Sequence, residues 1–409
     1  MSDPDRLLER VRAGELRLHE LDAHTDPDTA TAVRRRYVEA ETDVDLETVG
    51  EYAFDAEAAE PNIENMIGGV QVPMGVAGPV PVDGGAADGE YYLPLATTEG
   101  ALVASVNRGL STVSAAGGAA ARVTKHGMTR APVFRVNGVV DGLETVEWVN
   151  ENGETLREAA ESTTNHGELL GIEPYVVGDG VYLRFAFDTK DAMGMNMVTI
   201  ATRAACDVVE TETPAELVAL SGNLCSDKKP AAINAVEGRG RSVTAEVVVP
   251  GAVVEERLGT TAEGIVEANT RKNLIGSAKA GSLGFNAHAA NVVAATFLAT
   301  GQDEAHVVEG SNAITTMDSR ENDEDGSADL YASISLASLQ VGTVGGGTRL
   351  PTQAEALELI GVRGGGDPPG ANADALAEVI AVGALAGELS LLAALSSRHL
   401  ASAHEELGR

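Results

Sequence analysis

The sequence predicts an α+β fold, in which a large mixed domain surrounds a long buried helix and carries an inserted ferredoxin-like (split βαβ) small domain and a short helical N-terminal arm. Residues 132–220 read as strand, helix, two strands, helix and strand, the order of a split βαβ unit. An Ala- and Leu-rich segment from Asn372 to about Leu407 is long enough for one central helix. The first 50 residues are charged and poor in apolar volume, which favours short helices that pack on a larger body.

A chain of 409 residues accommodates two or three domains at ~100–200 residues each. We expect the arm over 1–50, a large domain formed by 51–131 and 221–409, and the small domain over 132–220. In the arm, 5–23 and 31–42 predict helices.

The next part of the large domain begins with turn and strand chemistry. Residues 61–95 are rich in Gly, Pro and Val, which leaves little room for helix. A helix is expected to begin near 97–99 and to continue through 101–109.

The small domain is predicted from alternating strand-like and helix-like segments. The turn Gly178-Asp179-Gly180 is a strong hairpin signal. In chain order we expect a strand at 132–140, a helix at 142–163, two strands within 175–187, a helix at 191–211 and a strand at 216–222.

The remaining elements belong to the large domain. Residues 231–250 are strand-like, 264–301 are Ala- and Gly-rich and helical, and 352–360 form a helix before a break at two prolines. Within the long helix that follows, 375–395 is apolar enough to suggest a membrane span. Glu378 and Glu388 lie inside it, so a buried helix is the better interpretation.

The charge of the chain excludes some partners. There are 62 Asp and Glu against 29 Lys and Arg, a net charge of −33, spread over every segment. Such a surface argues against binding nucleic acid or an anionic membrane. Only six residues are lysine, and acidic, lysine-poor surfaces suit a protein that stays soluble at high salt. An ordinary acidic enzyme is the alternative.

Two cysteines, Cys206 and Cys225, cannot form a disulfide framework, and no CxxC metal pair exists. Without a basic and apolar leader in the first 20 residues, we expect a cytoplasmic protein. No P-loop, GxGxxG dinucleotide motif, HExxH or GxSxG is present, and His399 and His404 are spaced wrongly to share a metal. No metal is therefore expected.

Four places stand out as candidates for chemistry, and each also has an ordinary structural interpretation. Glu99 near a helix start could donate a proton or only offset the helix dipole. Lys228 and Lys229 could stabilise an oxyanion or be a solvated surface pair, although two adjacent lysines are unexpected in so lysine-poor a chain. Asp303 follows a typical helix-ending Gly, and His404 could simply complement a helix dipole.

Two glycine-containing segments could contact a cofactor. Residues 191–197 (DAMGMNM) precede a helix whose free N–H groups could bind a phosphate, or they could be a helix cap on a Met-lined core. Residues 342–348 (GTVGGGT) are flexible enough to approach a dinucleotide, or they could be a glycine turn.

Together these segments resemble 3-hydroxy-3-methylglutaryl-coenzyme A (HMG-CoA) reductase, of the class found in eukaryotes and archaea. Nine matching stretches occur in the family's order and cover roughly residues 60–404, among them ENMIGGVQVPMGVAGP, LATTEGALVASVNRG, DAMGMNM, SGNLCSDKKPAAIN, GQD and GTVGGGT. The resemblance leads us to expect a member without the membrane-anchor domain of the animal enzymes, in agreement with the interpretation of 375–395 as a buried helix.

The resemblance implies roles for individual residues. The catalytic positions are Glu99, Lys228, Asp303 and His404. Those that hold the hydroxymethylglutaryl group are Arg130, Ser221, Asp227, Lys229 and Asn291, and those near coenzyme A are Ser105, Asn107, Arg108 and Lys272. The nicotinamide-dinucleotide contacts are Asp191, Met193, Gly194, Met195, Asn196, Val344, Gly345, Gly346 and Gly347, which makes 132–220 the dinucleotide-binding domain.

The same resemblance implies reduction of HMG-CoA to mevalonate and coenzyme A with two NADPH, and a homodimer or homotetramer with active sites between subunits. One departure concerns the cofactor: Asn165 and His166 stand where familiar members carry an Arg near the adenosine 2′-phosphate. The alternatives are the degradative NAD-dependent reductase, which oxidises mevalonate, and a non-enzymatic acidic interaction protein.

Overall fold

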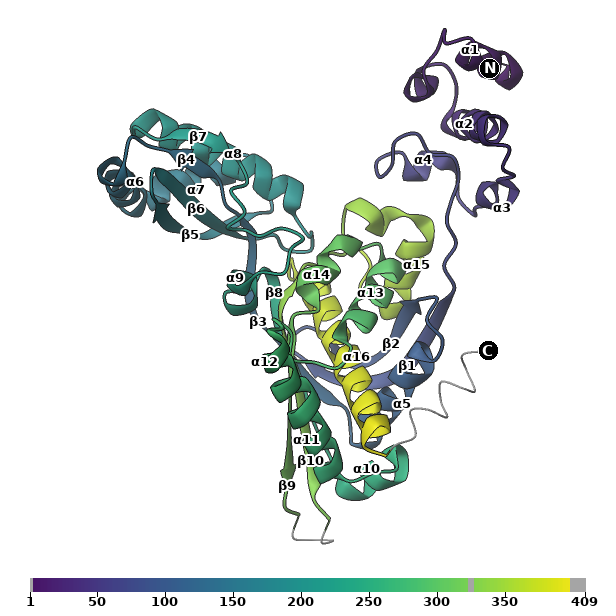
Figure 1. Ribbon diagram of the computed structural model, residues 1–409, viewed down its shortest axis with the longest axis vertical. Helices are drawn as coiled ribbons and strands as arrows, with labels where there is room; N and C mark the ends of the chain where they lie inside the picture. The colour runs from purple at the N-terminus through teal and green to yellow at the C-terminus, as the bar shows by residue number, and fades with distance from the viewer. Residues whose placement is uncertain (1–2, 323–326, 398–409) are drawn as a thin grey trace.

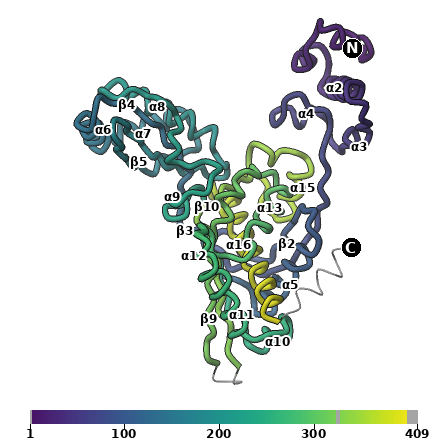
Figure 2. The backbone as a smooth tube through the Cα atoms, in the orientation of Figure 1, coloured from purple at the N-terminus to yellow at the C-terminus, as the bar shows by residue number. Residues whose placement is uncertain are grey.

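The computed structural model describes residues 3–322 and 327–397. Its body is a mixed sheet covered by helices, from which an N-terminal arm and a small lobe project at separate places (Figures 1 and 2). The predicted α+β class is confirmed.

The arm consists of short helices with their own apolar cluster. Two of them begin alike, because Asp3 and Asp26 are N-caps that precede a proline. Leu7, Leu21 and Val33 are at most 2% exposed and pack the helices together. The elements are α1 (Pro4–Arg12), the 3₁₀ helix η1 (Leu18–Ala23), α2 (Pro27–Thr42), α3 (Glu47–Gly50) and α4 (Ala56–Ala59).

The sheet of the body has the order β2-β1-β3-β8-β10-β9. All neighbours are antiparallel except β1 and β3, which are parallel. Its strands are β1 (Met74–Gly84), β2 (Asp88–Ala96), β3 (Ala119–Arg130), β8 (Gly240–Val249), β9 (Ala313–Arg320) and β10 (Asp329–Leu339). The strands β3, β9 and β10 were not predicted from the sequence. The predicted strand over 231–250 is wrong in its first part, which forms helix α9 (Ala232–Val236).

The long central helix is α16 (Ala371–Ser396), which lies across the sheet (Figure 1). Among the described residues it is the one helix long and apolar enough to cross a membrane, but 83% of its most apolar window is buried in the fold. Glu378 is 1% exposed and accepts hydrogen bonds from the backbone N–H groups of Gly85, Ala86 and Ala87. Glu388 is fully buried and accepts from His288 N–H. Both carboxylates thus have the partners that a buried charge requires.

Other helices surround α16. Gly109 of α5 (Leu102–Ala115) lies so close to it that an added Cβ would sit 1.9 Å from the Ala386 oxygen. The predicted start of this helix at 97–99 is wrong, because Ala101 has a left-handed φ of 70° and the helix begins after it. The rest are α10 (Gly251–Leu258), α11 (Ala262–Ala268), the π-helix η2 (Asn269–Gly276), α12 (Ser277–Ala280), α13 (Ala289–Thr300), η3 (Glu304–His306), α14 (Val307–Gly310), η4 (Gly346–Arg349) and α15 (Pro351–Ile360).

Two predicted helices of the body have different bounds in the structure. The continuous helix expected over 264–301 is interrupted, because Gly281 is left-handed and residues 281–288 form a loop before α13. The helix expected to run from Asn372 to about Leu407 is described from Ala371 to Ser396, and residues 398–407 lie outside the described residues.

The small lobe has the predicted order of elements, except that the single helix expected over 142–163 is two helices, which are separated at Asn152. Its strands pair antiparallel as β7-β4-β6-β5. This is the split βαβ order, in which each crossover helix skips one strand. The end of β3 pairs with β6 and joins the lobe to the body. The strand expected over 132–140 is shorter, because a helix begins at Val139. The elements are β4 (Val133–Arg135), α6 (Val139–Glu151), α7 (Gly153–Glu161), β5 (Glu168–Val177), β6 (Gly180–Asp188), α8 (Met195–Glu212) and β7 (Glu216–Ala219).

Candidate active site

The loop that carries Lys228 follows β7 and has an unusual backbone. Asn223, Ser226 and Lys228 all have left-handed φ values, of 62°, 44° and 57°. Left-handed non-glycine residues are costly and persist where the surroundings hold them. Buried Asn234 does part of this, since its Nδ2 donates to the carbonyl oxygens of Cys225 and Ser226. Cys225 is fully buried, as expected of an inert thiol.

Lys228 forms an ion pair with Asp303, with Nζ 2.8 Å from Oδ2. Asp303 follows α13 directly and caps η3 by accepting from Ala305 N–H. The hydrogen bond to Asp303 raises the pKa of Lys228 above its ordinary value, against the opposing effect of burial. Burial acts to raise the pKa of Asp303, but the hydrogen bond from Lys228 and the nearby His306 outweigh it and the net pKa is lowered. Both groups are therefore charged at neutral pH.

The other residues predicted for the hydroxymethylglutaryl group on this side lie in the same loop or close to it. Ser221 Oγ lies 3.5 Å from Cys225 Sγ, and Asp227 Oδ1 lies 3.0 Å from the guanidinium of Arg239. Lys229 is exposed, and its Nζ donates to the backbone oxygen of Asp227.

Glu99 and Asn291 form a second group. Glu99 is exposed in the turn before α5, and its Oε1 lies 3.4 Å from Asn291 Nδ2 in the first turn of α13. Asp303 lies beyond the other end of this 12-residue helix, which is about 18 Å long. Over residues 3–322 and 327–397, no hydrogen bond or ion pair joins Glu99 or Asn291 to Lys228 or Asp303.

The two glycine-containing segments lie side by side. Ala192 and Val344 form a parallel bridge, and Thr343 N–H donates to the Asp191 oxygen over 2.8 Å. A Cβ on Gly342 would sit 2.4 Å from Met193 N, so this approach requires glycine. The side chain of Gln302 bonds both the N–H and the oxygen of Gly342. The segment that holds Asp303 is thus fixed against both segments predicted to bind the cofactor.

The sequence of residues 30–409 matches the family described as hydroxymethylglutaryl-coenzyme A reductase. The chain belongs to this family. It is 69% identical over 409 residues to the 3-hydroxy-3-methylglutaryl-coenzyme A reductase of Haloferax volcanii, which covers all of both chains. The enzyme of Halobacterium salinarum is 70% identical over 408 residues, which cover all of this chain and 99% of that one.

The fold of HMG-CoA reductases is shared as well. The class II enzyme from Streptococcus pneumoniae bound to NADPH aligns over 96% of this chain and 97% of its own, with a TM-score of 0.65 and 21% identity. Family membership covers the small lobe, the body and the segments described above. His404, the fourth residue predicted to be catalytic, lies outside the described residues.

Residues predicted to lie near coenzyme A occupy α5 and the π-helix. Ser105 Oγ and Arg108 Nε lie 2.9 and 3.0 Å from Ser390 Oγ of α16. Asn107 Oδ1 accepts from Gly78 N–H. Lys272 is exposed on the π-helix. Arg130, at the end of β3, has a buried Nε without a partner among the described residues, and its contact with the hydroxymethylglutaryl group remains a prediction.

Asp191 has a role that the sequence analysis missed. It is 6% exposed, and its carboxylate accepts from the N–H groups of Gly366 in the loop before α16, of the N-cap Gly370 and of Ala373 in the first turn. Its side chain thus anchors the cofactor segment to the central helix, and a cofactor contact of this residue remains a prediction.

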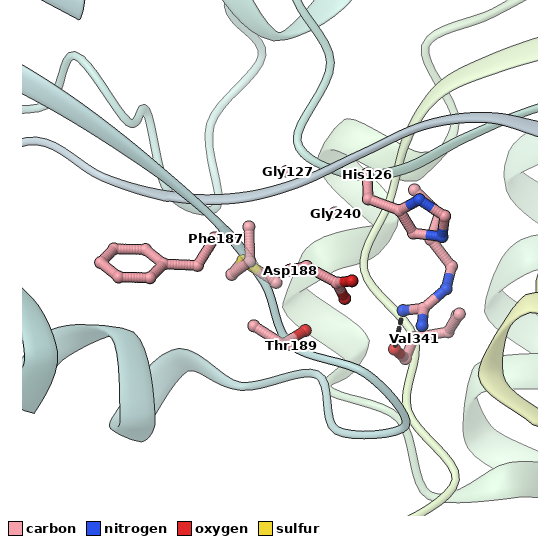
Figure 3. A pocket seen from close by; sticks show the side chains of 9 residues that line it. His126, Gly127, Phe187, Asp188, Thr189, Gly240 and Val341 are labelled. Atoms are coloured by element: carbon pink, nitrogen blue, oxygen red, sulfur yellow. Dashed lines mark hydrogen bonds between the residues drawn. The ribbon is translucent and has the colours of Figure 1, made fainter. Parts of the chain in front are cut away.

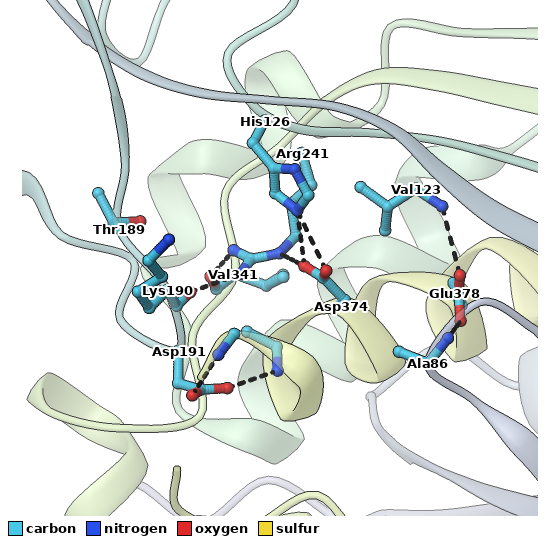
Figure 4. Close-up of polar contacts among 12 residues, drawn as sticks. Ala86, Val123, His126, Thr189, Lys190, Asp191, Arg241, Val341, Asp374 and Glu378 are labelled. Carbon is cyan, nitrogen blue, oxygen red and sulfur yellow. Dashed lines mark hydrogen bonds and ion pairs between the residues drawn. The ribbon is translucent and has the colours of Figure 1, made fainter. Parts of the chain in front are cut away.

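Figure 4 shows the same junction from the side of Arg241, whose Nε lies 2.6 Å from Asp374 Oδ1. His126 Nε2 lies 3.0 Å from the same oxygen. A cavity of about 10 Å³ beside them is lined by His126, Asp188 and Arg241 (Figure 3), and it has room for about one water. This cavity lies where the lobe joins the body, and it is not part of the predicted active site.

Three buried residues beside Lys228 were also missed. Arg239, His306 and Glu309 have side chains that are fully buried. In the sequence these three residues belong to no periodic pattern or motif that would distinguish them from ordinary core residues. Only the folded chain brings them beneath the Lys228 loop.

Proposed function

We propose that this protein reduces (S)-HMG-CoA to mevalonate and coenzyme A with two NADPH, as a member of the eukaryotic and archaeal class of the family. The observation that carries the proposal is the Lys228–Asp303 ion pair, held 2.8 Å apart next to the two cofactor segments. A charged ammonium beside a hydride-donor site is the arrangement that reduction of a carbonyl needs.

The residues present fit a nicotinamide dinucleotide. Gly194 is the left-handed N-cap of α8 and provides no side-chain cap, so the first N–H groups of this 18-residue helix are available to a phosphate. Gly345 and Gly346 have φ values of 76° and 53° and open space where a Cβ would be. Met193, Met195, Asn196, Val344 and Gly347 complete the segments that would hold the group.

The bound nicotinamide supplies hydride, and the chain's own residues handle charge and protons. The Lys228 ammonium stabilises the oxyanion that forms at the substrate carbonyl in each reduction. Asp303 keeps that ammonium protonated and fixes its position. Glu99 gives a proton to the aldehyde oxygen, and His404 protonates the departing coenzyme A thiolate.

The site is completed by a second subunit. Within one chain, Glu99 and Lys228 lie near opposite ends of α13, about 18 Å apart along its axis. One thioester carbon cannot contact both groups at that separation, and this supports a site in which Glu99 of one subunit faces Lys228 of the other. A homodimer is the minimal assembly, and a homotetramer would contain the same pair twice.

Other features fit this assignment. Cys206 and Cys225 are free and buried, as in proteins of the reducing cytoplasm.

The Asp227, His306 and Glu309 side chains approach one another within 4.8 Å, but the cation between them is the Arg239 guanidinium, so no metal is needed. The ligands are HMG-CoA, mevalonate, coenzyme A and NADPH, and neither nucleic acid nor a membrane surface is a partner.

The test is NADPH consumption with HMG-CoA across a range of KCl concentrations. Turnover is expected to fall roughly 100-fold or more in Lys228→Met, the loss typical of an oxyanion donor. Lys125→Met is the matched control, since Lys125 pairs with Glu237 on the surface and should leave turnover unchanged. No turnover of the parent at any salt concentration would refute the function, and preferred mevalonate oxidation with NAD would favour the degradative alternative.

A further inference from the structure

Beneath the Lys228 loop lies a buried ion pair between Arg239 and Glu309. Both side chains are fully buried, and Arg239 Nη1 lies 3.3 Å from Glu309 Oε1. Buried ion pairs are expensive to desolvate and are often no more stabilising than apolar residues of the same shape. The other groups that Arg239 and Glu309 contact therefore indicate what this ion pair does.

The Glu309 carboxylate has a second partner in the active site. Its Oε1 accepts the backbone N–H of Lys228 over 2.8 Å. Lys228 has a left-handed φ of 57°, a conformation that needs an external hold in a non-glycine residue. Because φ and ψ of Lys228 set the direction of its Cα–Cβ bond, this hydrogen bond controls where the ammonium points.

Arg239 holds the neighbouring residues of the site. Its Nη2 lies 3.0 Å from Asp227 Oδ1 and donates to Met195 Sδ over 2.9 Å. Asp227 precedes Lys228 in the loop, and Met195 is the first residue of α8. One buried ion pair therefore contacts the Asp227–Lys228 peptide from below and the helix start that is predicted to bind the cofactor.

We propose that Glu309 is a positioning residue, which accepts the Lys228 N–H to hold this residue left-handed and so directs its ammonium toward Asp303 and the substrate carbonyl. This inference rests on the proposed function for its kinetic consequences. Glu309 touches neither substrate nor cofactor and acts only through Lys228. Burial raises its pKa above the ordinary value, and a neutral acid would still offer an oxygen to the same N–H.

Two substitutions separate positioning from simple packing. Glu309→Gln retains an oxygen that can accept the Lys228 N–H but removes the charge that pairs with Arg239. Glu309→Leu removes both. If Glu309 positions Lys228, kcat of E309Q stays within about threefold of the parent, whereas kcat of E309L falls roughly 100-fold, the order of loss expected from a displacement of about 1 Å. Equal losses in the two variants would show that only the ion pair matters and would overturn the proposal.

A second pair of variants controls for loss of activity through unfolding. Without the Glu309 charge, the buried Arg239 keeps only Asp227 as an anionic partner, which is destabilising, so both substitutions are repeated with Arg239→Met, which removes the buried guanidinium. E309Q/R239M and E309L/R239M then differ only in the acceptor for the Lys228 N–H, and the same ratio of kcat values is expected. Glu378→Leu is the matched control, because Glu378 of α16 is a carboxylate 1% exposed that accepts four backbone N–H groups, none of them from the Lys228 loop. It should lower the melting temperature and leave kcat unchanged.

The last measurement needs no turnover. Modification of Lys228 by trinitrobenzenesulfonate is followed against pH by peptide mass spectrometry, which is practical with six lysines in the chain. Because the bond to Asp303 raises the pKa of Lys228, a misdirected ammonium titrates lower. The midpoint should fall in E309L and stay at the parent's value in E309Q. If the parent fails to reduce HMG-CoA, the proposed function fails, and an equal midpoint in both variants would separately refute the positioning role.

Discussion

The Nζ of Lys228 lies 2.8 Å from Oδ2 of Asp303, although the two residues are 75 positions apart in the sequence. This bond is the main cause of the raised pKa of Lys228. The raised pKa favours stabilisation of an oxyanion by the ammonium, because the lysine stays charged to higher pH. The pair thus sets both the position of the charge and the pH range over which it is present.

Asp303→Asn tests this relationship. Without the carboxylate, the pKa of Lys228 should move down, so the alkaline limb of the kcat/KM profile moves to lower pH. At neutral pH we expect a roughly 100-fold loss of kcat, since a misplaced donor no longer meets the oxyanion. The measurement is the pH dependence of HMG-CoA reduction, and an unchanged alkaline limb would contradict the assignment. Glu304→Gln is the matched control, as Glu304 lies in the adjacent turn without contacting Lys228.

Part of this site was predictable from sequence, for a physical reason. Lysine is rare in this acidic chain, with six in all, so the adjacent pair Lys228 and Lys229 stands out. The long helix α16 was predictable because its apolar composition is continuous. Its two buried carboxylates also signalled an internal helix, and each now has backbone partners from remote segments.

The missed features depend on pairing at long range. The strand β9 has few apolar residues and exposes Ile314, Thr316, Asp318 and Arg320. It is held as a strand by β10, with which it pairs from Ala313 to Arg320. Glu309 lies 81 residues from Lys228, and Asp191 lies 182 residues from Ala373, whose N–H it accepts. No local pattern encodes such partners. The start of α5 was missed because Ala101 adopts a left-handed conformation for which alanine gives no signal.

Mixing two inactive variants tests the shared site. Glu99→Gln removes the proton donor and Lys228→Met removes the ammonium, so each homodimer should be inactive. In a mixed dimer, one site combines the intact Glu99 of one chain with the intact Lys228 of the other. Random mixing makes half of the dimers mixed, each with one intact site, so about a quarter of the parent's activity should return. The assay is NADPH consumption after denaturation and joint refolding at high salt. If the mixture stays inactive while refolded parent recovers, both residues act within one chain.

His306 predicts a pH dependence of stability. It is fully buried, with Nε2 3.4 Å from Asp227 Oδ1, and burial followed by the charge of Arg239 lowers its pKa from 6.5 to about 4. The unfolded chain therefore binds a proton at higher pH than the folded one does. Stability from this group is complete above pH 6.5 and is lost as the pH falls toward 4, by about 3 kcal/mol in all.

The comparison variant is His306→Gln, which is neutral at every pH. Urea unfolding at constant high salt should show the parent losing stability faster than this variant between pH 6.5 and 4, by up to ~1.4 kcal/mol per pH unit. If the free energies of unfolding of the two proteins change in parallel with pH, His306 is protonated as readily in the folded protein as in the unfolded chain.

The loop that ends at Gly167 predicts cofactor preference. A Cβ on Gly167 would lie 2.8 Å from Met197 Cε in the first turn of α8, so residues 162–167 pack against the helix predicted to hold the dinucleotide. Asn165 is exposed, and the resemblance to the family predicts that it occupies the position of an arginine that meets a 2′-phosphate. Asn165→Arg should lower KM for NADPH by roughly tenfold through a charge-assisted bond and leave KM for NADH unchanged. Asn137→Arg is the control, because it adds the same charge on an exposed site of the same lobe. Equal effects on both cofactors would show that the loop does not face the phosphate.

Salt should control substrate capture through the net charge of −33. HMG-CoA and NADPH are polyanions, and a surface this acidic repels them until ions shorten the screening length from ~10 Å at 0.1 M to ~3 Å at 1 M. The counter-charge at the site comes from few groups, including Arg130, Lys228 and Lys272. Cofactor affinity should therefore rise with KCl.

A comparison of two cofactors separates this field effect from folding. NADPH carries about two more negative charges than NADH at neutral pH, because of its extra phosphate. The acidic surface repels it more strongly, so its dissociation constant should fall more steeply than that of NADH as KCl screens the repulsion. Gain of folded protein at high salt would instead change both constants by the same factor. Nicotinamide fluorescence titrations, with far-UV circular dichroism at each salt concentration, distinguish the two. Identical slopes for NADPH and NADH would assign the salt requirement to the stability of the fold alone.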